Sequence, residues 1–586
     1  MQTRCLSHRT IIWLCLGIWR LAGRRGALAA FAAGALAAAP AAASIYTVGA
    51  GAGCTHADLL SALIDAVNHA GSDEIRLLIN SNHQGPFFIN TDGLILRGGF
   101  ASCTATTPTG FSTLLGTNSS RALFLNASGL AYLERLNLTG GHVAGNGGGL
   151  FVQGPSDSVV LSNVAVFGNS ATGFGGNIYV ASVAGAVLTL ADGSLVASGQ
   201  AQDGGGLACA GAGKVSLKTG SLIANNVATE NGGGLHLSSG CTFEHLATGN
   251  FAGIVSNQAG SDGGGAFVDS GADLATGYWP GGLAEISNNT AHWFGGGVYL
   301  RGAGSVLQAY FARIAGNHSD NDGGGVAADT GTFVVFGRPS IDPDVCVDPS
   351  RCSLVQGNSA AVAGGAVWSY GATVTAHGTR FENNTATAGG AIGAFENQSS
   401  VTLSSSILAG NSGPKPLGVG TGTTLLLGNV TAVGNSGAGP GFISFGPGPG
   451  DVRVLSSLFD QPDSQIFTGF STQLVQLDCV LSRTVNFLSG LPSGTVTRAI
   501  VIADPRLRNP SAGDYRLSET SPAIDRCDTS QWQGAPNDLE WQGRDIDHAL
   551  PNGLGIRDLG ADEASLLQRD GFESGGTGTW WIPELP

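Results

Sequence analysis

Polar side chains that could act as acids or metal ligands recur just before short runs of glycine. They are Asn146, Asp203, Asn231, Asp262 and Asp322. Carboxylates in such a column could bind Ca²⁺ or transfer protons. The alternative is structural, because short Asn and Asp side chains bond backbone amides in turns. Asn alternates with Asp, and Phe294 stands in the same column. We therefore favour the structural interpretation and expect no metal site.

A second column carries aromatic residues at the second position of the short apolar stretch after each glycine run. Its members are Phe151, Tyr179, His236, Phe267 and Tyr299. The first and third positions are mostly aliphatic, as in Leu150 and Val152. If the aliphatic residues point into a core, the rings form an exposed stripe that could bind sugars or a protein. The alternative is the reverse orientation, with the rings stacked inside.

Other catalytic signals are weak. The serines and histidines have no motif context that would define a Ser-His-Asp triad. The glycine runs are not phosphate loops, because no Lys-Ser or Lys-Thr follows them and no helix begins there. Charged residues make up 12% of the chain. We predict no catalytic residue and no cofactor.

The elements that must position both columns come from an internal repeat, as in "IANNVATENGGGLHL" and "ISNNTAHWFGGGVYL". Copies recur about every 28–30 residues. Most copies have an apolar residue, then an asparagine three positions on, then the glycine run. Gly141 and Ser198 take the place of the asparagine in two copies. The asparagines that we expect to stack are Asn169, Asn226, Asn257, Asn289, Asn317, Asn358 and Asn384.

A strand–turn–strand unit of this size cannot bury its apolar side alone. Stacking equivalent coils ~4.8 Å apart buries that side against the next coil. Asparagine and glycine both tolerate the positive φ that a turn needs. The sequence therefore predicts an all-β chain, a single-stranded right-handed parallel β-helix, with asparagines stacked at one turn.

The first 43 residues carry five arginines, no acid, and an Ala-rich apolar run before "PAAAS". This pattern is typical of a signal peptide, so we expect export and no transmembrane span in the mature chain. The chain has 42 acidic and 27 basic residues, which excludes nucleic acid as an expected partner.

Eight cysteines remain after the leader, and an even number in an exported chain indicates disulfides. We expect Cys346–Cys352 within an inserted loop. In chain order, the other pairs would be Cys54–Cys103, Cys209–Cys241 and Cys479–Cys527.

"FENNTATAGGAI" resembles the repeats of chlamydial polymorphic outer membrane proteins, at Phe381, Asn384 and Gly389–Ile392. The resemblance covers about residues 138–412 and implies adhesion at a Gram-negative cell surface. Residues 45–103 look like the entry coil of pectin-lyase-like β-helices, with a capping helix near Ala57–Ala70. Residues 504–525 and 557–563 resemble the closing segment of choice-of-anchor β-helix proteins. Residues 569–581 are similar to a C-terminal tag of exported proteins.

Together these features predict six segments. They are a signal peptide (1–43), an N-terminal cap with first coils (44–137), the repeat β-helix (138–412), further coils (413–503), a closing segment (504–563) and a tail (564–586). We expect a monomeric, extracellular or surface-bound protein that binds glycans or a partner protein without catalysis. The alternative is a polysaccharide lyase or glycoside hydrolase of the pectin-lyase-like type.

Overall fold

The computed structural model describes residues 43–69, 71–90, 93–126, 129–154, 158–182, 185–246, 252–277, 284–337, 353–395, 398–413, 415–436, 441–446, 450–461, 465–468, 474–489, 491–527, 537–539 and 555–562. These residues belong to one compact unit, 42–586. The expected signal peptide and the Cys346–Cys352 pair lie outside them. Among the described residues, no helix has the length and apolarity needed to cross a bilayer.

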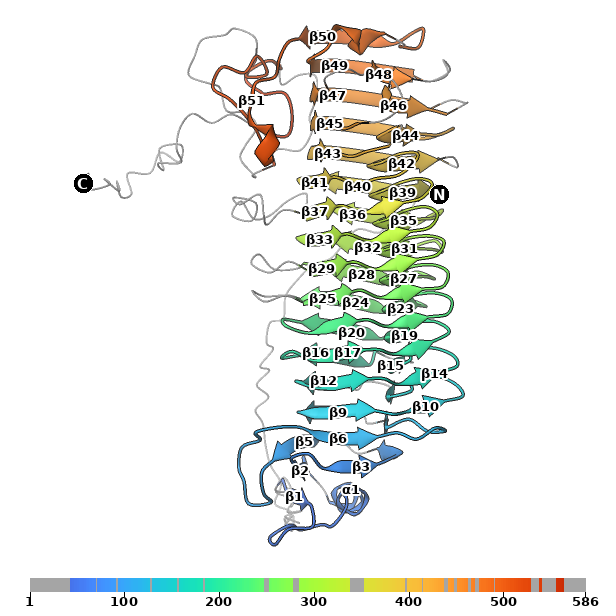
Figure 1. The fold of residues 1–586 in the computed structure, drawn as a ribbon, viewed down its shortest axis with the longest axis vertical. Coiled ribbons are helices and arrows are strands. Elements are labelled where there is room, and N and C mark those ends of the chain that lie inside the picture. Colours follow the sequence, from blue (N-terminus) through green and yellow to red (C-terminus); the bar gives the residue numbers. More distant parts are fainter. Residues whose placement is uncertain are drawn as a thin grey trace, which may run out of the picture. The chain divides into compact units, whose positions relative to one another are not determined.

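The unit is a parallel β-solenoid whose coils stack along one axis (Figure 1). One coil, for example, runs through β25 (Ala252–Val255), β26 (Gln258–Ala259), β27 (Ala266–Val268) and β28 (Asp273–Thr276). Each of these strands pairs in parallel with its counterpart in the next coil, β29, β30, β31 and β32. The predicted all-β, parallel solenoid is therefore confirmed.

Three parallel sheets form the sides of the solenoid. The 28-stranded sheet contains β1 (Ile45–Val48), β2 (Glu74–Leu78), β3 (Asn82–Gln84), β5 (Leu94–Phe100), β6 (Ser112–Leu115), β8 (Leu130–Glu134), β9 (Leu136–Thr139), β12 (Ser158–Ser162), β13 (Ala165–Phe167), β16 (Val187–Ala191), β17 (Leu195–Ala197), β20 (Lys214–Lys218), β21 (Leu222–Ala224), β24 (Thr242–Leu246), β25, β28, β29 (Ala284–Ser287), β32 (Val306–Ala309), β33 (Ala312–Ala315), β36 (Phe333–Phe336), β37 (Ser353–Gln356), β40 (Thr373–His377), β41 (Thr379–Glu382), β43 (Ser400–Ala409), β45 (Thr424–Val433), β47 (Asp451–Asp460), β49 (Leu474–Ser482) and β50 (Val496–Ile502).

The 8-stranded sheet contains β10 (His142–Val143), β14 (Ser170–Ala171), β18 (Gln200–Ala201), β22 (Val227–Ala228), β26, β30 (Thr290–Ala291), β34 (His318–Ser319) and β38 (Ser359–Ala360). The 14-stranded sheet contains β4 (Phe87–Ile89), β7 (Leu123–Leu125), β11 (Leu150–Gln153), β15 (Ile178–Ser182), β19 (Leu207–Gly211), β23 (Leu235–Ser238), β27, β31 (Val298–Leu300), β35 (Val326–Ala328), β39 (Val367–Tyr370), β42 (Ile392–Phe395), β44 (Leu417–Val419), β46 (Gly441–Phe445) and β48 (Gln465–Thr468).

Inward-facing aliphatic side chains fill the solenoid. Leu, Val and Ile residues of successive coils form one continuous buried cluster from Val48 to Val480. Alternation along each strand sends every second residue into this core. The strands are short because the chain must turn at each corner of a coil.

Asparagines stack at the corner between the 28-stranded and 8-stranded sheets, as predicted. Asn257 donates from Nδ2 to the Oδ1 of Asn289 (3.0 Å) and to the backbone carbonyl of Ile223 (3.0 Å). Its own Oδ1 accepts from the backbone N–H of Asn226 (3.0 Å). The same bonds recur through Asn317, Asn358 and Asn384, each of them fully buried. Every amide in this asparagine ladder therefore has its partners.

The asparagine ladder extends beyond the predicted members. Past Asn384, Asn384 Nδ2 donates to Asn411 Oδ1 (2.9 Å), and Asn411 Nδ2 donates to Asn435 Oδ1 (2.8 Å). The coil between Asn169 and Asn226 has Gly199 at the ladder position, where its N–H donates to Asn226 Oδ1. Asn177, at the end of the preceding glycine run, fills that gap, since it accepts from Asn169 Nδ2 and donates to Asn226 Oδ1.

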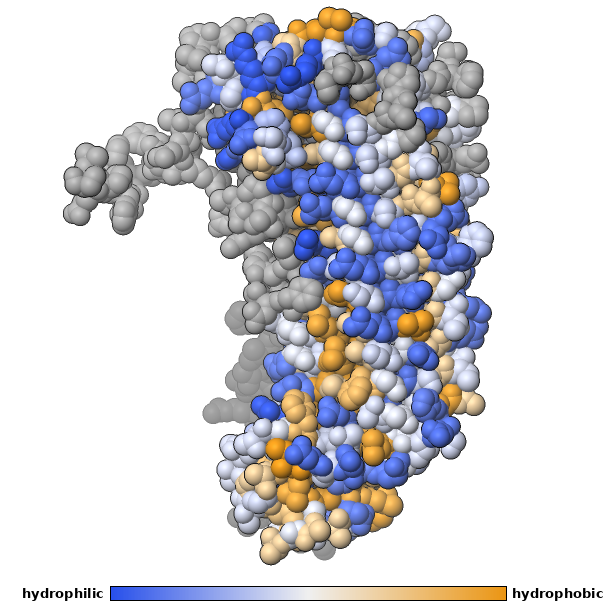
Figure 2. Space-filling view, viewed as in Figure 1, coloured by the Kyte–Doolittle hydropathy of each residue, from blue (hydrophilic) through white to orange (hydrophobic). Residues whose placement is uncertain are grey.

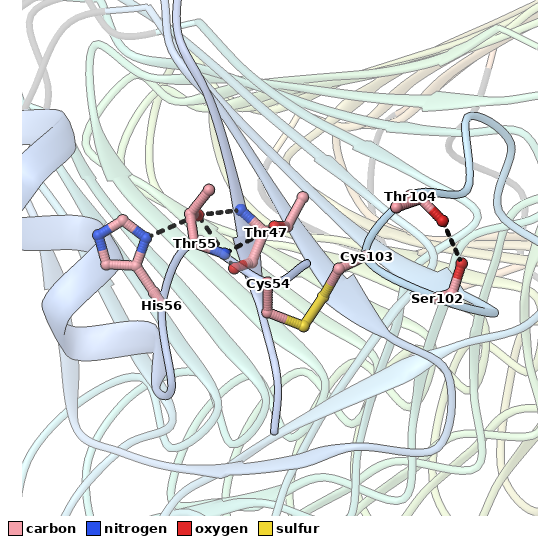
Figure 3. The surroundings of a disulfide bond; sticks show 7 residues. All are labelled: Thr47, Cys54, Thr55, His56, Ser102, Cys103 and Thr104. Atoms are coloured by element: carbon pink, nitrogen blue, oxygen red, sulfur yellow. Dashed lines mark hydrogen bonds between the residues drawn. A yellow bond between two sulfur atoms is a disulfide. The ribbon is translucent and has the colours of Figure 1, made fainter. Parts of the chain in front are cut away.

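The helix α1 (Leu59–Asn68) covers the N-terminal end, as expected. Asp58 caps it by accepting from the N–H of Ser61 (2.9 Å). Leu59, Ala62, Leu63 and Ala66 of α1 join the core. Figure 3 shows the disulfide that joins Cys54 to Cys103 beside paired hydrogen bonds between Thr47 and Thr55. Cys209–Cys241 and Cys479–Cys527 are also joined.

The C-terminal segment packs against the side of the solenoid, where we had expected it to cover the end. It contains the antiparallel pair β51 (Leu507–Asn509) and β52 (Asp514–Leu517). Leu517, Ala523 and Leu559 pack on Leu458 and Leu481. Leu539 and Ala561 pack on Ile407 and Ala409. These outward-facing apolar residues of β43, β47 and β49 explain the side position, because burying them requires a cover.

Candidate functional site

The aromatic column of the 14-stranded sheet lies outside the solenoid core. Leu150 and Val152 of β11 belong to the core cluster. Phe267, Tyr299 and Ala327 form a separate cluster with Phe294 and Trp368. Of the two orientations that the alternation allows, the one with aliphatic side chains inward and aromatic side chains outward is observed.

The expected exposure of this column is nevertheless wrong at its centre. Phe267, Tyr299 and His236 are 0%, 5% and 7% exposed, whereas Phe151 and Tyr179 are half-buried. The rings cover one another, with centroids 5.0 Å apart for His236 and Phe267 and 5.6 Å apart for Phe267 and Tyr299. The central rings are therefore packed structure and cannot serve as a contact surface.

Two further phenylalanines close the gaps left by alanines in the column. The ring centroids of Phe174 and His236 are 5.5 Å apart, and Ala208 is the column residue between Tyr179 and His236. Phe294 stacks on Trp368 (5.2 Å) in the region of Ala327. With Phe88 and Phe124 they make one aromatic ladder from β4 to Tyr370. Sequence reasoning missed Trp368. In this coil Ala366 stands where other coils have the last glycine, so aligning the copies on their glycines placed Val367, one residue too early, in the aromatic column.

The Asn/Asp column before the glycines bonds the backbone of the next coil. Asn146, Asp203 and Asp262 accept the N–H of Phe174 (2.9 Å), Asn231 (3.1 Å) and Phe294 (3.1 Å). Burial raises the pKa of Asp262, and it raises the pKa of Asp322 to about 6. Within the described residues, no group of three or more His, Cys, Asp or Glu side chains is arranged to hold a metal. The geometry matches the structural interpretation.

Arg301 is a charged side chain that borders the aromatic ladder and is paired with a carboxylate. The guanidinium of Arg301 lies over the Phe267 ring (4.8 Å to its centroid) and bonds Asp269 (3.0 Å). Burial, aided by the Asp329 charge, raises the pKa of Tyr299. Burial lowers the pKa of His236, although Asp203 and Asp269 oppose that shift. His236 is thus held neutral among rings.

A polar network on the neighbouring corner was not found from the sequence. Asp320 bridges His292 Nδ1 (3.0 Å) and His318 Nε2 (3.1 Å), and His318 Nδ1 lies 2.8 Å from Ser359 Oγ. The two histidines hold the pKa of Asp320 below its usual range. The four residues come from three successive coils, so only the inter-coil register brings them together.

Trp293 lies beside this network and is 50% exposed. Its ring packs edge-on against His292, with centroids 5.5 Å apart. We call Trp293, His292, Asp320 and His318 the corner site. Further polar residues share its corner, including Gln202, which bonds Glu230 (3.0 Å).

The Ser359–His318–Asp320 arrangement has the composition of a hydrolase triad, but its surroundings do not suit acyl transfer. The backbone N–H groups of Ser359, Ala360 and Ala361 donate to carbonyls of adjacent coils. They cannot also stabilise an oxyanion. The side chains of Asp320 and His318 are 53% and 44% exposed, so water screens their charges. The corner site can bind polar groups better than it can activate a nucleophile.

No protein-family model and no curated protein sequence matches this chain.

Proposed function

We propose that this protein is an exported, non-catalytic β-solenoid that binds an extended, uncharged glycan along the corner that carries Trp293. The corner site is the observation that supports the proposal. A half-exposed indole offers a flat apolar face for a sugar ring, and Asp320 beside two histidines offers acceptors and donors for hydroxyls. The contact surface thus moves from the buried rings of Phe267 and Tyr299 to the corner.

The solenoid suits an extended ligand because its corner is straight and rigid. Gln202, Glu230, Ser261 and Asn321 are other polar residues of this corner, and all four are at least partly exposed. A preformed row of groups loses little entropy when it binds a chain of sugars. The net charge of −15 disfavours polyanions.

Export and a Gram-negative cell-surface or extracellular location are parts of this proposal. They are supported by the leader pattern of residues 1–43 and by the disulfides, which persist in oxidising compartments. The likeness of residues 138–412 to polymorphic outer membrane protein repeats favours an adhesive role. We expect a monomer.

The test is Trp293→Ala on a glycan array, run in parallel with a sugar-release assay. We expect the affinity for bound glycans to fall at least tenfold and the unfolding midpoint to stay within experimental error. Phe333→Ala is a matched control, because Phe333 is 45% exposed on the 28-stranded sheet. Equal losses in both variants, or release of sugars by the wild type, would refute the proposal.

A second candidate function, cleavage of a polysaccharide, is favoured by one row on the outer face of the 28-stranded sheet. Lys214 Nζ on β20 bonds Glu244 on the next strand, β24 (2.7 Å). On the two strands that follow, Gln308 of β32 donates to Asp273 of β28 (2.9 Å). Burial, aided by the Glu244 charge, raises the pKa of Asp273. Glycosidases use a pair of carboxyl groups in which the pKa of one is raised. Any sugar release that Asp273→Asn abolishes would select this candidate.

A further inference from the structure

A small cavity lies where the C-terminal segment packs against the side of the solenoid. Its walls come from β41, β43, residues 512–516, and residues 539, 561 and 562. In Figure 2, hydrophilic residues with hydrophobic ones between them gather where this segment meets the upper coils. The volume of the cavity is about 190 Å³. Clefts for drug-sized molecules measure ~300–1,000 Å³, so this cavity suits a single ring or a smaller group.

The inner wall of the cavity is apolar. Ile407, Leu539 and Ala561 line it and are 4%, 3% and 1% exposed. The mouth is polar, because the side chain of Arg516 is 47% exposed and bonds the carboxylate of Asp514 (2.7 Å). A ligand would therefore pass an ion pair and place its apolar part against aliphatic side chains.

Two side chains that line the cavity carry a donor with no partner among the described residues. Arg380 donates from Nε to Glu382 (2.6 Å) and from Nη2 to the carbonyl of Gly513 (3.3 Å), which leaves its Nη1 unpaired. The hydroxyl of Tyr515 is the second donor. Burial, aided by the Glu382 charge and opposed by Arg380, raises the pKa of Tyr515, so this hydroxyl stays protonated. Both groups can bind an acceptor atom of a ligand.

The charges around the cavity disfavour an anion as that acceptor. Arg380 and Arg516 are each paired with a carboxylate, Glu382 and Asp514. Asp562 adds a third carboxylate to the site. The site therefore has no net positive charge that would attract a negative ligand. A neutral carbonyl oxygen fits the two donors better.

We propose that this cavity binds a neutral N-acyl group, such as the acetamido group of an N-acetylhexosamine. The carbonyl oxygen accepts from Arg380 Nη1 and from the Tyr515 hydroxyl. The methyl group lies against Ile407 and Leu539. This second site is on the 28-stranded sheet, apart from the corner site, and it does not rest on the proposed function.

The test is saturation-transfer difference NMR of the full chain with N-acetylglucosamine and, separately, with acetate. We expect the acetamido methyl to receive more saturation than any other proton of the sugar, and acetate to receive none. Tyr515→Phe keeps the ring and should raise the Kd for N-acetylglucosamine at least about fivefold, because one hydrogen bond is lost. Arg380→Lys should raise it at least about tenfold, because the paired fork of the guanidinium is lost as well.

Matched controls exist for both substitutions. Tyr132→Phe changes another partly buried tyrosine, on β8. Arg313→Lys changes an arginine that lies in the same column of the 28-stranded sheet as Arg380 and pairs with Glu285 (3.6 Å). Neither control should change the Kd.

Trp293→Ala separates this site from the corner site. We expect it to leave the Kd for N-acetylglucosamine unchanged. Loss of binding in Trp293→Ala but not in Tyr515→Phe would place the sugar at the corner and overturn the proposal. Equal saturation of acetate and of the acetamido methyl would overturn it too, and so would the same Kd in Arg380→Lys and Arg313→Lys.

Discussion

His245 lies inside the solenoid, between Leu217 of the preceding coil and Thr276 of the next in the same column. It is fully buried, and neither ring nitrogen has a hydrogen-bond partner among the described residues. Burial lowers the pKa of His245 to about 4, and the backbone of Ala252 only partly opposes the shift. As the pH falls, His245 is therefore protonated in the unfolded chain before it is protonated in the folded protein.

The first prediction concerns this histidine. Because the unfolded pKa is near 6.5 and the folded one near 4, the stability of the wild type should fall between those pH values. The difference between the two pKa values corresponds to roughly 3 kcal/mol of unfolding free energy. His245→Leu should remove this part of the pH dependence of the unfolding midpoint between pH 7.5 and 4. His142→Leu, at an exposed position, is the control, and equal slopes in wild type and His245→Leu would contradict the argument.

The orientation of the aromatic residues was predictable from the sequence, but their burial was not. Alternation along one strand fixes which side chains face outward. Whether an outward ring is covered depends on other coils, as when Phe174 fills the space near Ala208. Phe174 and Ala208 are far apart in the chain, so a local pattern carries no such information.

The second prediction follows from this packing. Phe267→Ala should lower the free energy of unfolding by about 3–5 kcal/mol, because it opens a cavity between His236 and Tyr299. Phe88→Ala should cost far less, since Phe88 ends the ladder and is 63% exposed. Urea titration followed by circular dichroism measures both. A small effect at Phe267 would show that the neighbouring rings collapse into the space.

At the scale of the element, the asparagine ladder was the best-predicted feature. An offset of about eight residues before the end of each glycine run identified five members, and shorter offsets identified Asn358 and Asn384. The offset is nearly constant because a stacked amide needs the same place in every coil. Asn177 could not be found this way, since it reaches the ladder from a different position in its coil. Asn411 and Asn435 follow coils whose glycine runs are incomplete.

The third prediction tests the ladder. Asn257→Ala leaves the backbone N–H of Asn226, the carbonyl of Ile223 and Asn289 Oδ1 without this partner. Each buried group left unpaired costs about 1–3 kcal/mol, so we expect a loss of at least about 2 kcal/mol in urea titration. Asn225→Gly is the control, because Asn225 is exposed and has a φ of 55°, which glycine adopts freely. Similar losses in both variants would exclude a special role of the ladder.

At the scale of the whole molecule, the two ends of the solenoid are built differently. The likeness of residues 45–103 to the entry coil of pectin-lyase-like β-helices predicted the helix at the N-terminal end, and α1 confirms it. The side position of the C-terminal segment was not predictable, because it depends on the outward faces of Ile407, Leu458 and Leu481. Those residues look like ordinary core positions in the sequence.

The fourth prediction concerns the N-terminal end. Cys54 and Cys103 close a loop with a sequence separation of 49, and loss of such a bond typically costs about 2–4 kcal/mol. Cys54→Ser/Cys103→Ser should make residues 45–103 sensitive to limited proteolysis at temperatures where residues 138–337 stay resistant. Simultaneous cleavage of both regions would instead indicate that the solenoid unfolds as one cooperative unit.

The coil-to-coil repetition of the asparagine bonds also bears on how such a chain can change length through recombination. Excision of residues 258–289 would join Asn257 directly to Thr290, and Asn257 would then face Asn317 in place of Asn289. Every remaining strand would keep the kind of neighbour that it has now. Deletion or duplication of one coil is therefore a small step for the gene, and it moves the two ends of the protein by one strand spacing without redesigning either.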